Sequence, residues 1–232
     1  MFLGIDRLII AAQDCERAAT KLRSTLGLEL GRQGAPPPEG GLAWRSVQLE
    51  GARLTLMAVE DRLEAASTWL GRAVLAALAG SSDGAFVGFA LASDDLAGDA
   101  GQRGWLPGAA SERLPGGEGL WPLAFGVQAS PDAPAIGDAH HGDLQVVRLE
   151  VEVEAVRAVQ DRWLRAFDLR FRPSLAGGGA RDADVGRQVV RLVPARLSAV
   201  VPPRATVVLA GPSRSAEVEL AGCRVRLERR SG

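Results

Sequence analysis

The first sixty residues set one helix pattern among several strand patterns, and this order restricts the possible folds more than any other feature. Residues 2–11 hold an apolar, β-branched run that is typical of a buried strand. Apolar residues then recur every three or four positions up to Leu26, which predicts an amphipathic helix with Asp14 as N-cap and Gly27 as C-terminal stop. The order β-α-β-β-β is completed by strand patterns at 28–31, 42–49 and 52–59.

The middle of the chain contains a similar order of elements with little residue identity. A connecting helix is predicted over 61–79, followed by a strand over 85–92 and a short helix that begins near Asp94. Residues 104–119 are rich in Gly and Pro and are predicted to form a loop. A further apolar strand is predicted at 120–127.

The last third repeats the order once more, after a Pro- and Ala-rich linker at 130–142. The predicted elements there are a strand at 144–153, a helix at 155–167 and strands at 187–193, 197–201, 206–209 and 217–227. We expect one compact unit with three parts: a first module at 1–60, a connecting helix and divergent second module at 61–143, and a C-terminal module at 144–232.

Charge, hydropathy and cysteine content exclude several functional classes. The 27 Lys and Arg residues against 28 Asp and Glu residues give a net charge of −1, so no positive field exists to hold a nucleic acid. The apolar runs are far shorter than the ~20 residues of a membrane-spanning helix. Two cysteines cannot form a disulfide framework, which suits a reducing compartment. The excess of Ala, Gly and Arg is typical of a GC-rich bacterial genome, and we expect a bacterial, cytoplasmic protein that binds neither nucleic acid nor membrane.

Several short motifs are similar to a known family. They lie at residues 4–10, at Asp14 with the helix that it opens, at 26–30, at 40–41 and at 54–59. Together they resemble the first module of the glyoxalase-like proteins of the vicinal oxygen chelate (glyoxalase/bleomycin resistance/dioxygenase) superfamily. The resemblance implies an α+β fold of paired βαβββ modules, in which curved mixed sheets enclose a small-molecule cleft and the helices lie outside.

The same resemblance bears on metal binding. In metal-dependent members, the first and last strands of a module present a His and a Glu or Gln to the cleft. Here Arg7 and Thr55 stand at the matching positions. A guanidinium has no lone pair for a metal, and a lone hydroxyl is a poor ligand. We therefore expect a metal-independent protein without a cofactor.

Five residues are predicted to line the cleft. Arg7 is the candidate anion clamp, and Thr55 faces opposite to its apolar neighbours on its strand, toward the cleft side. Trp44, Trp121 and Phe125 are candidate pocket walls, because ligand pockets are mostly apolar. Each has a structural alternative: a solvent-facing or ion-paired arginine, a structural hydroxyl, and aromatic rings packed in the core.

The remaining candidates have structural interpretations. His140 and His141 are the only histidines, and adjacent residues of an extended segment point apart, so both are predicted to have surface or loop roles. No metal-binding spacing surrounds them. Glu150, Glu152 and Glu154 share one face of a strand and are predicted to be solvated, since neighbouring like charges are tolerated only in water.

The leading hypothesis is a glyoxalase-like protein that binds or sequesters a small organic molecule without a metal. If this protein is an enzyme, the hypothesis is proton transfer next to a carbonyl, with Arg7 stabilising the oxyanion. No general base is evident, and enzymatic activity is left open. The alternatives are a divalent-metal lyase, isomerase or dioxygenase with relocated ligands such as His140, and a non-catalytic protein-interaction module. The family also implies a possible homodimer. The ligand, the oligomeric state and the roles of the histidines and the 130–142 linker are left open.

Overall fold

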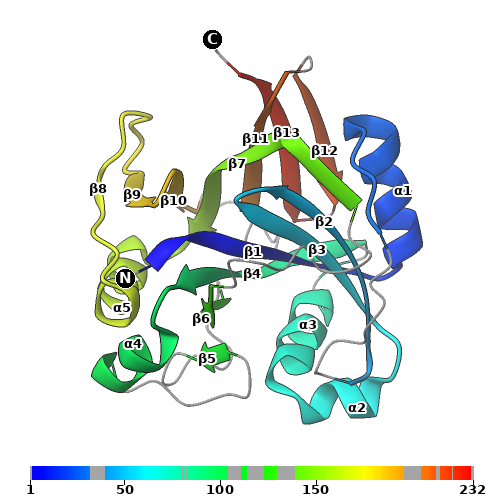
Figure 1. Ribbon diagram of the computed structural model, residues 1–232, viewed down its shortest axis with the longest axis horizontal. Helices are drawn as coiled ribbons and strands as arrows, with labels where there is room; N and C mark the ends of the chain where they lie inside the picture. The colour runs from blue at the N-terminus through cyan, green and yellow to red at the C-terminus, as the bar shows by residue number, and fades with distance from the viewer. Residues whose placement is uncertain are drawn as a thin grey trace.

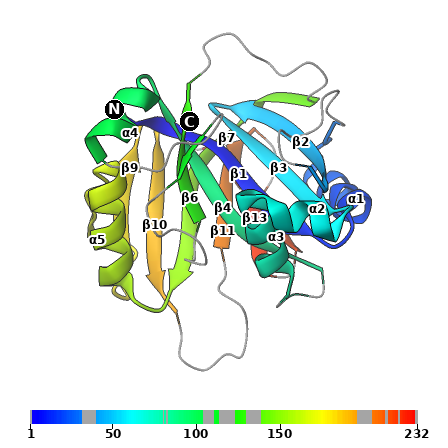
Figure 2. The ribbon, with the colours of Figure 1, turned by 90° about the horizontal axis from the view of Figure 1, so that it is seen from below.

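The structure is a computed structural model, and it describes residues 2–31, 40–79, 81, 83–103, 111–113, 123–129, 139–195, 205–212, 215–220 and 222–230. Figures 1 and 2 show α1 and α5 on opposite sides of the molecule. The elements in chain order are β1 (Phe2–Ala12), α1 (Cys15–Leu26), β2 (Leu42–Glu50), β3 (Ala52–Val59), α2 (Arg62–Ser67), α3 (Trp69–Ala79), β4 (Gly84–Ser93), α4 (Leu96–Arg103), β5 (Ser111–Arg113), β6 (Leu123–Gln128), β7 (Ala139–Val153), α5 (Val156–Phe167), β8 (Arg172–Pro173), β9 (Arg181–Val185), β10 (Gln188–Pro194), β11 (Ala205–Gly211), β12 (Ala216–Leu220) and β13 (Cys223–Arg229).

Helix α1 forms where the sequence predicts it, because its start and stop signals are local. The Asp14 carboxylate accepts hydrogen bonds from the backbone N–H groups of Glu16 and Arg17. Gly27 ends the helix in the left-handed conformation, with φ of 72°. The predicted apolar face is buried, and it comprises Cys15, Ala18, Leu22 and Leu26.

The two halves of the chain have the same strand order. In the N-terminal sheet, β1 is parallel to β3 and antiparallel to β4, and the order is β2-β3-β1-β4-β6-β5. In the C-terminal sheet, β7 is parallel to β10 and antiparallel to β11, and the order is β9-β10-β7-β11-β13-β12. The chain thus contains a twofold structural repeat, in which β4, β5 and β6 of the middle segment complete the N-terminal sheet.

The repeat also fixes which residues are equivalent. Helices α1 and α5 both have 12 residues. Arg7 lies seven residues before the N-cap Asp14, and Arg148 lies seven before the N-cap Ala155. The helix-ending Gly27 corresponds to Asp168, which is also left-handed, with φ of 54°. Arg7 and Arg148 are therefore counterparts on the first strand of each half.

A strand pairing and a buried side chain are among the contacts that join the halves. The beginning of β7 pairs in parallel with the end of β2, so the strands form one continuous curved sheet. In addition, the buried Gln188 side chain accepts a hydrogen bond from the Ile5 N–H and donates one to the Ile5 carbonyl. The predicted linker at 130–142 consequently ends inside β7, which begins at Ala139 because β2 offers it a pairing edge.

Two hydrophobic cores lie on opposite faces of the N-terminal sheet. The larger core combines Leu8 and Ile10 of β1 with residues of α1, α5 and the C-terminal sheet, including Trp163, whose ring centroid is 5.2 Å from that of Phe89. The smaller core contains Ile9, whose side chain points to the face opposite to that of Leu8 and Ile10. This core lies between the sheet and α3. Figure 1 shows α2 and α3 beneath the N-terminal sheet.

Several predicted elements differ from those observed. The helix over 61–79 is divided at Thr68, whose hydroxyl accepts a hydrogen bond from the Gly71 N–H and so starts α3. The single strand at 217–227 is a hairpin that turns at Gly222, with φ of 90°. The segment 28–31 forms only one bridge, between Gly31 and Ser46.

The remaining differences concern short or undescribed segments. The predicted loop at 104–119 contains the three-residue strand β5, and strands β8 and β9 were not predicted. The strand predicted at 197–201 lies outside the described residues. In the part of the chain that the structure describes, no helix is long and apolar enough to cross a membrane.

Candidate functional site

Four of the five predicted ligand-binding residues lie on one face of the N-terminal sheet. Arg7 is two residues from Ile9 on β1, and Thr55 is paired with Ile9 on β3, so all three side chains point the same way. Trp44 on β2 and Phe125 on β6 belong to the smaller core on this face. Trp121 lies outside the described residues. These four residues thus share a face of the sheet, and their role in binding a ligand stays a prediction.

Helix α3 covers the apolar end of this face. Its buried residues Leu70, Val74 and Leu78 belong to the same core as Met57 and Phe125. The packing was not predicted from the sequence, although α3 carries a single charged residue, and a helix that is apolar almost all round must be buried.

The aromatic residues of this face pack against that helix. The Phe125 ring centroid lies 5.0 Å from that of Trp69 at the start of α3, and the planes meet at 76°. Phe125 is 4% exposed, and Trp44 is half-buried against the same core. Their described contacts are with the chain itself, so a role for them as ligand-contacting walls stays a prediction.

The other end of the face is polar, and its residues are paired across three strands. Gln48 of β2 is the partner of Arg53 on β3, which is in turn the partner of Arg7 on β1. The Arg53 Nε donates a hydrogen bond to Gln48 Oε1 at 3.3 Å. The Arg7 Nε lies 3.9 Å from Asp6 Oδ2, and the Arg7 side chain is 29% exposed. We call Arg7, Gln48, Arg53 and Thr55 the polar end.

Sequence reasoning missed Gln48 and Arg53, although a signal for Arg53 existed. Arg53 is two residues before Thr55 on the same strand and so must share its face. Its adjacency to Arg7, in contrast, depends on the parallel pairing of β1 with β3.

Thr55 is the residue of the polar end that lies next to the apolar end, since it pairs with Ile9. It is 2% exposed, and its Oγ1 has no hydrogen-bond partner among the described residues. A buried hydroxyl without a partner costs about 1–3 kcal/mol, and most buried polar groups are hydrogen-bonded. The position therefore offers an unused donor and acceptor directly beside the strand that carries Arg7.

The residues at the ligand positions of the family do not fit a metal ion. In the N-terminal half they are Arg7 and Thr55. The repeat gives their counterparts in the C-terminal half as Arg148 and Arg191, because Arg191 pairs with Glu150 as Thr55 pairs with Ile9. Three arginines and one threonine offer no imidazole, carboxylate or thiolate. Within the described residues, no three His, Cys, Asp or Glu side chains form a group that could hold a metal ion.

The corresponding face of the C-terminal sheet is charged. Glu150 Oε1 accepts hydrogen bonds from Arg148 Nε at 2.7 Å and from Arg191 Nη1 at 3.1 Å. Arg191 also binds both carboxylate oxygens of Asp182, at 2.7 and 3.0 Å, which lowers the pKa of Asp182 below its usual range. Glu150 is thus a shared ion-pair partner, and not the simply solvated charge that strand alternation predicted.

The contrast between the two faces follows from the lengths of two links. Residues 60–83 connect β3 to β4 and form α2 and α3, which cover the first face. Residues 195–204 connect β10 to β11 and are fewer than half as many. A link of that length has too few residues for two such helices. Apolar side chains accordingly lie under α3, and ion pairs occupy the equivalent strands of the second sheet.

The structure describes the side chain of one histidine and only the backbone of the other. His141 is half-buried, and its Nε2 accepts a hydrogen bond from the Glu29 N–H at 3.2 Å, which ties the start of β7 to the segment after α1. His140 is in β7, opposite Gln48, and its side chain lies outside the described part of the structure. The loop expected for these residues is therefore strand, and His141 has a structural contact.

Comparison with known proteins identifies the fold. No family sequence model matches the chain, and no curated protein sequence matches it. A solved structure of a hypothetical protein from Staphylococcus aureus superposes with a TM-score of 0.72 at 12% identity, covering 97% of this chain and 99% of that one. A mutant of 4-hydroxymandelate synthase from Streptomyces coelicolor superposes with a TM-score of 0.59 at 16% identity, covering 90% of this chain and 72% of the synthase. The chain has the vicinal oxygen chelate fold.

A glyoxalase from Novosphingobium aromaticivorans, solved with bound Mn(II), has the same vicinal oxygen chelate fold. Its TM-score is 0.58 at 10% identity, and the match covers 98% of this chain and 82% of the glyoxalase. The predicted resemblance is thus confirmed for the fold. Identities this low do not transfer chemistry, since one fold hosts many functions.

Proposed function

We propose that this protein binds a small organic anion at the polar end of the N-terminal face, and that it does so without a metal. The observation that supports the proposal most directly is Thr55, a buried hydroxyl without a partner in the described structure, on the face that also carries Arg7. An anionic oxygen of a ligand would accept a hydrogen bond from this hydroxyl and remove the cost of its burial.

The neighbouring residues define the chemistry of the ligand. Arg7 and Arg53 are partners on adjacent parallel strands, whose backbones are spaced about 4.8 Å apart. Guanidinium groups bind carboxylates with charge-assisted and often bidentate hydrogen bonds. Because α3 fills the apolar end, the ligand must be small, with its carboxylate or enolate oxygen toward Arg7. Binding or sequestration needs nothing more than these contacts.

The proposal distinguishes this chain from one of its structural neighbours. A glyoxalase with bound Mn(II) shares the fold, but here arginine and threonine occupy the positions that the family resemblance matches to metal ligands. If the protein is catalytic, the reaction in keeping with its residues is proton transfer next to a carbonyl, with the Arg7 guanidinium stabilising the oxyanion. A general base for that reaction is not evident among the residues of the polar end.

The test combines metal analysis with anion titration. Untagged protein, purified without chelator, is analysed for Zn, Mn, Fe and Ni, and is then titrated calorimetrically with acetate, pyruvate, malonate and succinate. We expect no stoichiometric metal and saturable binding of at least one carboxylate. Arg7→Met should weaken that binding at least tenfold. Arg17→Met, which changes an exposed arginine of α1, is the matched control and should leave it unchanged.

Two results would contradict the proposal. Stoichiometric metal, retained after dialysis, would favour the alternative of a metal-dependent enzyme with relocated ligands. Failure of every carboxylate to bind folded wild-type protein would favour the alternative of an interaction module.

A further inference from the structure

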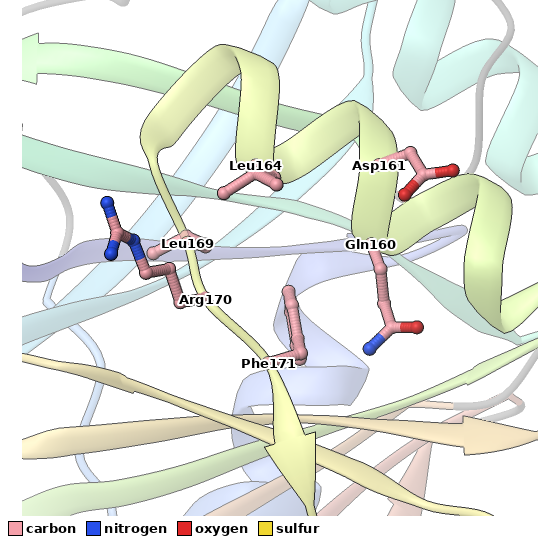
Figure 3. Close-up of a pocket in the computed structure, with 6 residues that line it drawn as sticks. All are labelled: Gln160, Asp161, Leu164, Leu169, Arg170 and Phe171. Atoms are coloured by element: carbon pink, nitrogen blue, oxygen red, sulfur yellow. The ribbon is translucent and has the colours of Figure 1, made fainter.

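The described structure contains a cavity that is separate from the polar end. It has a volume of about 410 Å³ and lies between α5 and the segment that follows this helix. Small-molecule sites in proteins usually have volumes of about 300–1,000 Å³, so the cavity has room for a small ligand. Figure 3 shows its lining residues, which are Gln160, Asp161, Leu164, Leu169, Arg170 and Phe171.

The lining has an apolar centre and charged ends. Figure 3 shows Leu164 on the helix, with Leu169 and Phe171 on the segment below it, while Asp161 and Arg170 lie toward opposite ends of the cavity. Leu169 is 5% exposed and forms part of the core, whereas Leu164 is 45% exposed. The cavity thus presents apolar surface to the outside between one carboxylate and one guanidinium.

The internal repeat allows this corner to be compared with its equivalent in the first half. There the corner lies between α1 and residues 28–31, and parts of the C-terminal half contact both segments. Strand β12 packs on α1, and His141 binds the Glu29 N–H. In the second half, β5 holds the place of β12 in the sheet order, but it does not pack on α5 in a comparable way. Leu164 is the counterpart of Arg23, and both positions are exposed, so the second half differs in presenting an apolar side chain at this position.

The charges at the two ends give an orientation to any bound molecule. The Arg170 Nε is 3.3 Å from Asp168 Oδ1, and these side chains are 82% and 54% exposed. Solvent screens exposed ion pairs and leaves them weak, so Arg170 can exchange this partner at little cost. Asp161 at the other end repels an anion. A negative group is therefore favoured at the Arg170 end only.

We propose that this cavity is a second binding site and that its ligand is a small aromatic carboxylate. The ring of the ligand packs on the apolar side chains of Leu164 and Leu169 and against the ring of Phe171, a contact that aromatic pairs favour beyond the area that they bury. Its carboxylate binds Arg170, and the amide of Gln160 is within the lining to donate a further hydrogen bond.

The experiment uses intact wild-type protein and matched probe pairs. Saturation-transfer NMR and calorimetry are performed with benzoate, phenylacetate and indole-3-acetate, and with the corresponding amides. We expect saturable binding of at least one carboxylate and at least tenfold weaker binding of its amide. Leu164→Glu should weaken carboxylate binding at least tenfold, because it sets a like charge in the apolar centre.

Control variants separate this site from a folding defect and from the polar end. Leu63→Glu changes another exposed leucine, 86% exposed on α2, and should leave binding unchanged. Arg170→Gln should weaken binding of the carboxylate but not binding of the amide. Arg165→Gln, on the exposed side of α5, should leave the binding of both unchanged. Arg7→Met should also have no effect on aromatic carboxylates.

Three outcomes would overturn the inference. The first is absence of saturable binding by every aromatic carboxylate. The second is binding that Leu164→Glu leaves intact. The third is binding that Arg7→Met abolishes while Leu164→Glu does not, which would assign the anion to the polar end and leave the function proposed above standing.

Discussion

Replacement of Thr55 by valine separates the two roles that its hydroxyl can have. Valine has nearly the same shape and an equally favourable β propensity, so the change removes the hydroxyl and leaves the packing of β3. The side chain is 2% exposed, and its Oγ1 lacks a partner in the described structure. Relief of an unpaired buried hydroxyl is worth about 1–3 kcal/mol, and we expect the free energy of unfolding to rise by about 1 kcal/mol.

The assay is urea unfolding followed by circular dichroism, together with the melting temperature. For a chain of this size, 1 kcal/mol corresponds to about 2–4 °C. Thr206→Val is the matched control, because Thr206 is also a strand threonine but is only half-buried. We expect this variant to have the free energy of unfolding of the wild type.

Carboxylate affinity measured on the same variants completes the test. Thr55→Val should be more stable than wild type and should bind the carboxylate more weakly, whereas a purely structural hydroxyl predicts loss of stability. A fall of more than about 1 kcal/mol in the free energy of unfolding would refute the reasoning, since that is the cost of losing a satisfied hydrogen bond.

Three further predictions concern other parts of the molecule. Ala155→Asp should stabilise the protein by about 1 kcal/mol in urea unfolding, because α5 has no side-chain cap. Neither Cys15 nor Cys223 should react with a thiol reagent at pH 8 before unfolding, since burial raises the pKa of Cys15 to about 12 and also raises that of Cys223. Asp182→Asn should cost about 2 kcal/mol at pH 7. The hydrogen bond from Arg191 lowers the pKa of Asp182 in the folded protein. The stabilisation that the Asp182 carboxylate gives is therefore complete above about pH 5, and it is lost as the pH falls from about 4 through the pKa of the folded state. The free energies of unfolding of variant and wild type should consequently differ less at pH 3 than at pH 7.

The repeat shows how one framework can produce two different surfaces. Ile9 and Glu150 are counterparts on the first strands of the two halves, five residues before their helix caps. Ile9 is buried under α3, and Glu150 joins two arginines. The link that follows each module differs in length, and only the longer one has enough residues to form two helices such as α2 and α3.

Local signals in the sequence were sufficient for most of the first module, although the strand predicted at 28–31 forms only one bridge. The Asp14 cap, the left-handed Gly27 and the apolar spacing of α1 each act within a few residues, so helix and flanking strands were predicted close to their observed bounds. Gly222, in contrast, turns a hairpin inside a run that reads as one continuous strand. That turn depends on the pairing of β12 with β13, which strand alternation alone does not specify.

The sequence by itself determined most of the element order of the vicinal oxygen chelate fold, and strand alternation set Thr55 opposite to its apolar neighbours. These follow from the periods of helix and strand and from family motifs, which are properties of neighbouring residues. Only the tertiary structure decided that α3 covers the apolar end, that Arg53 lies beside Arg7, and that a cavity opens next to α5. These features depend on which strands become neighbours and on how far a link reaches, and such contacts are made between residues that are distant in the chain.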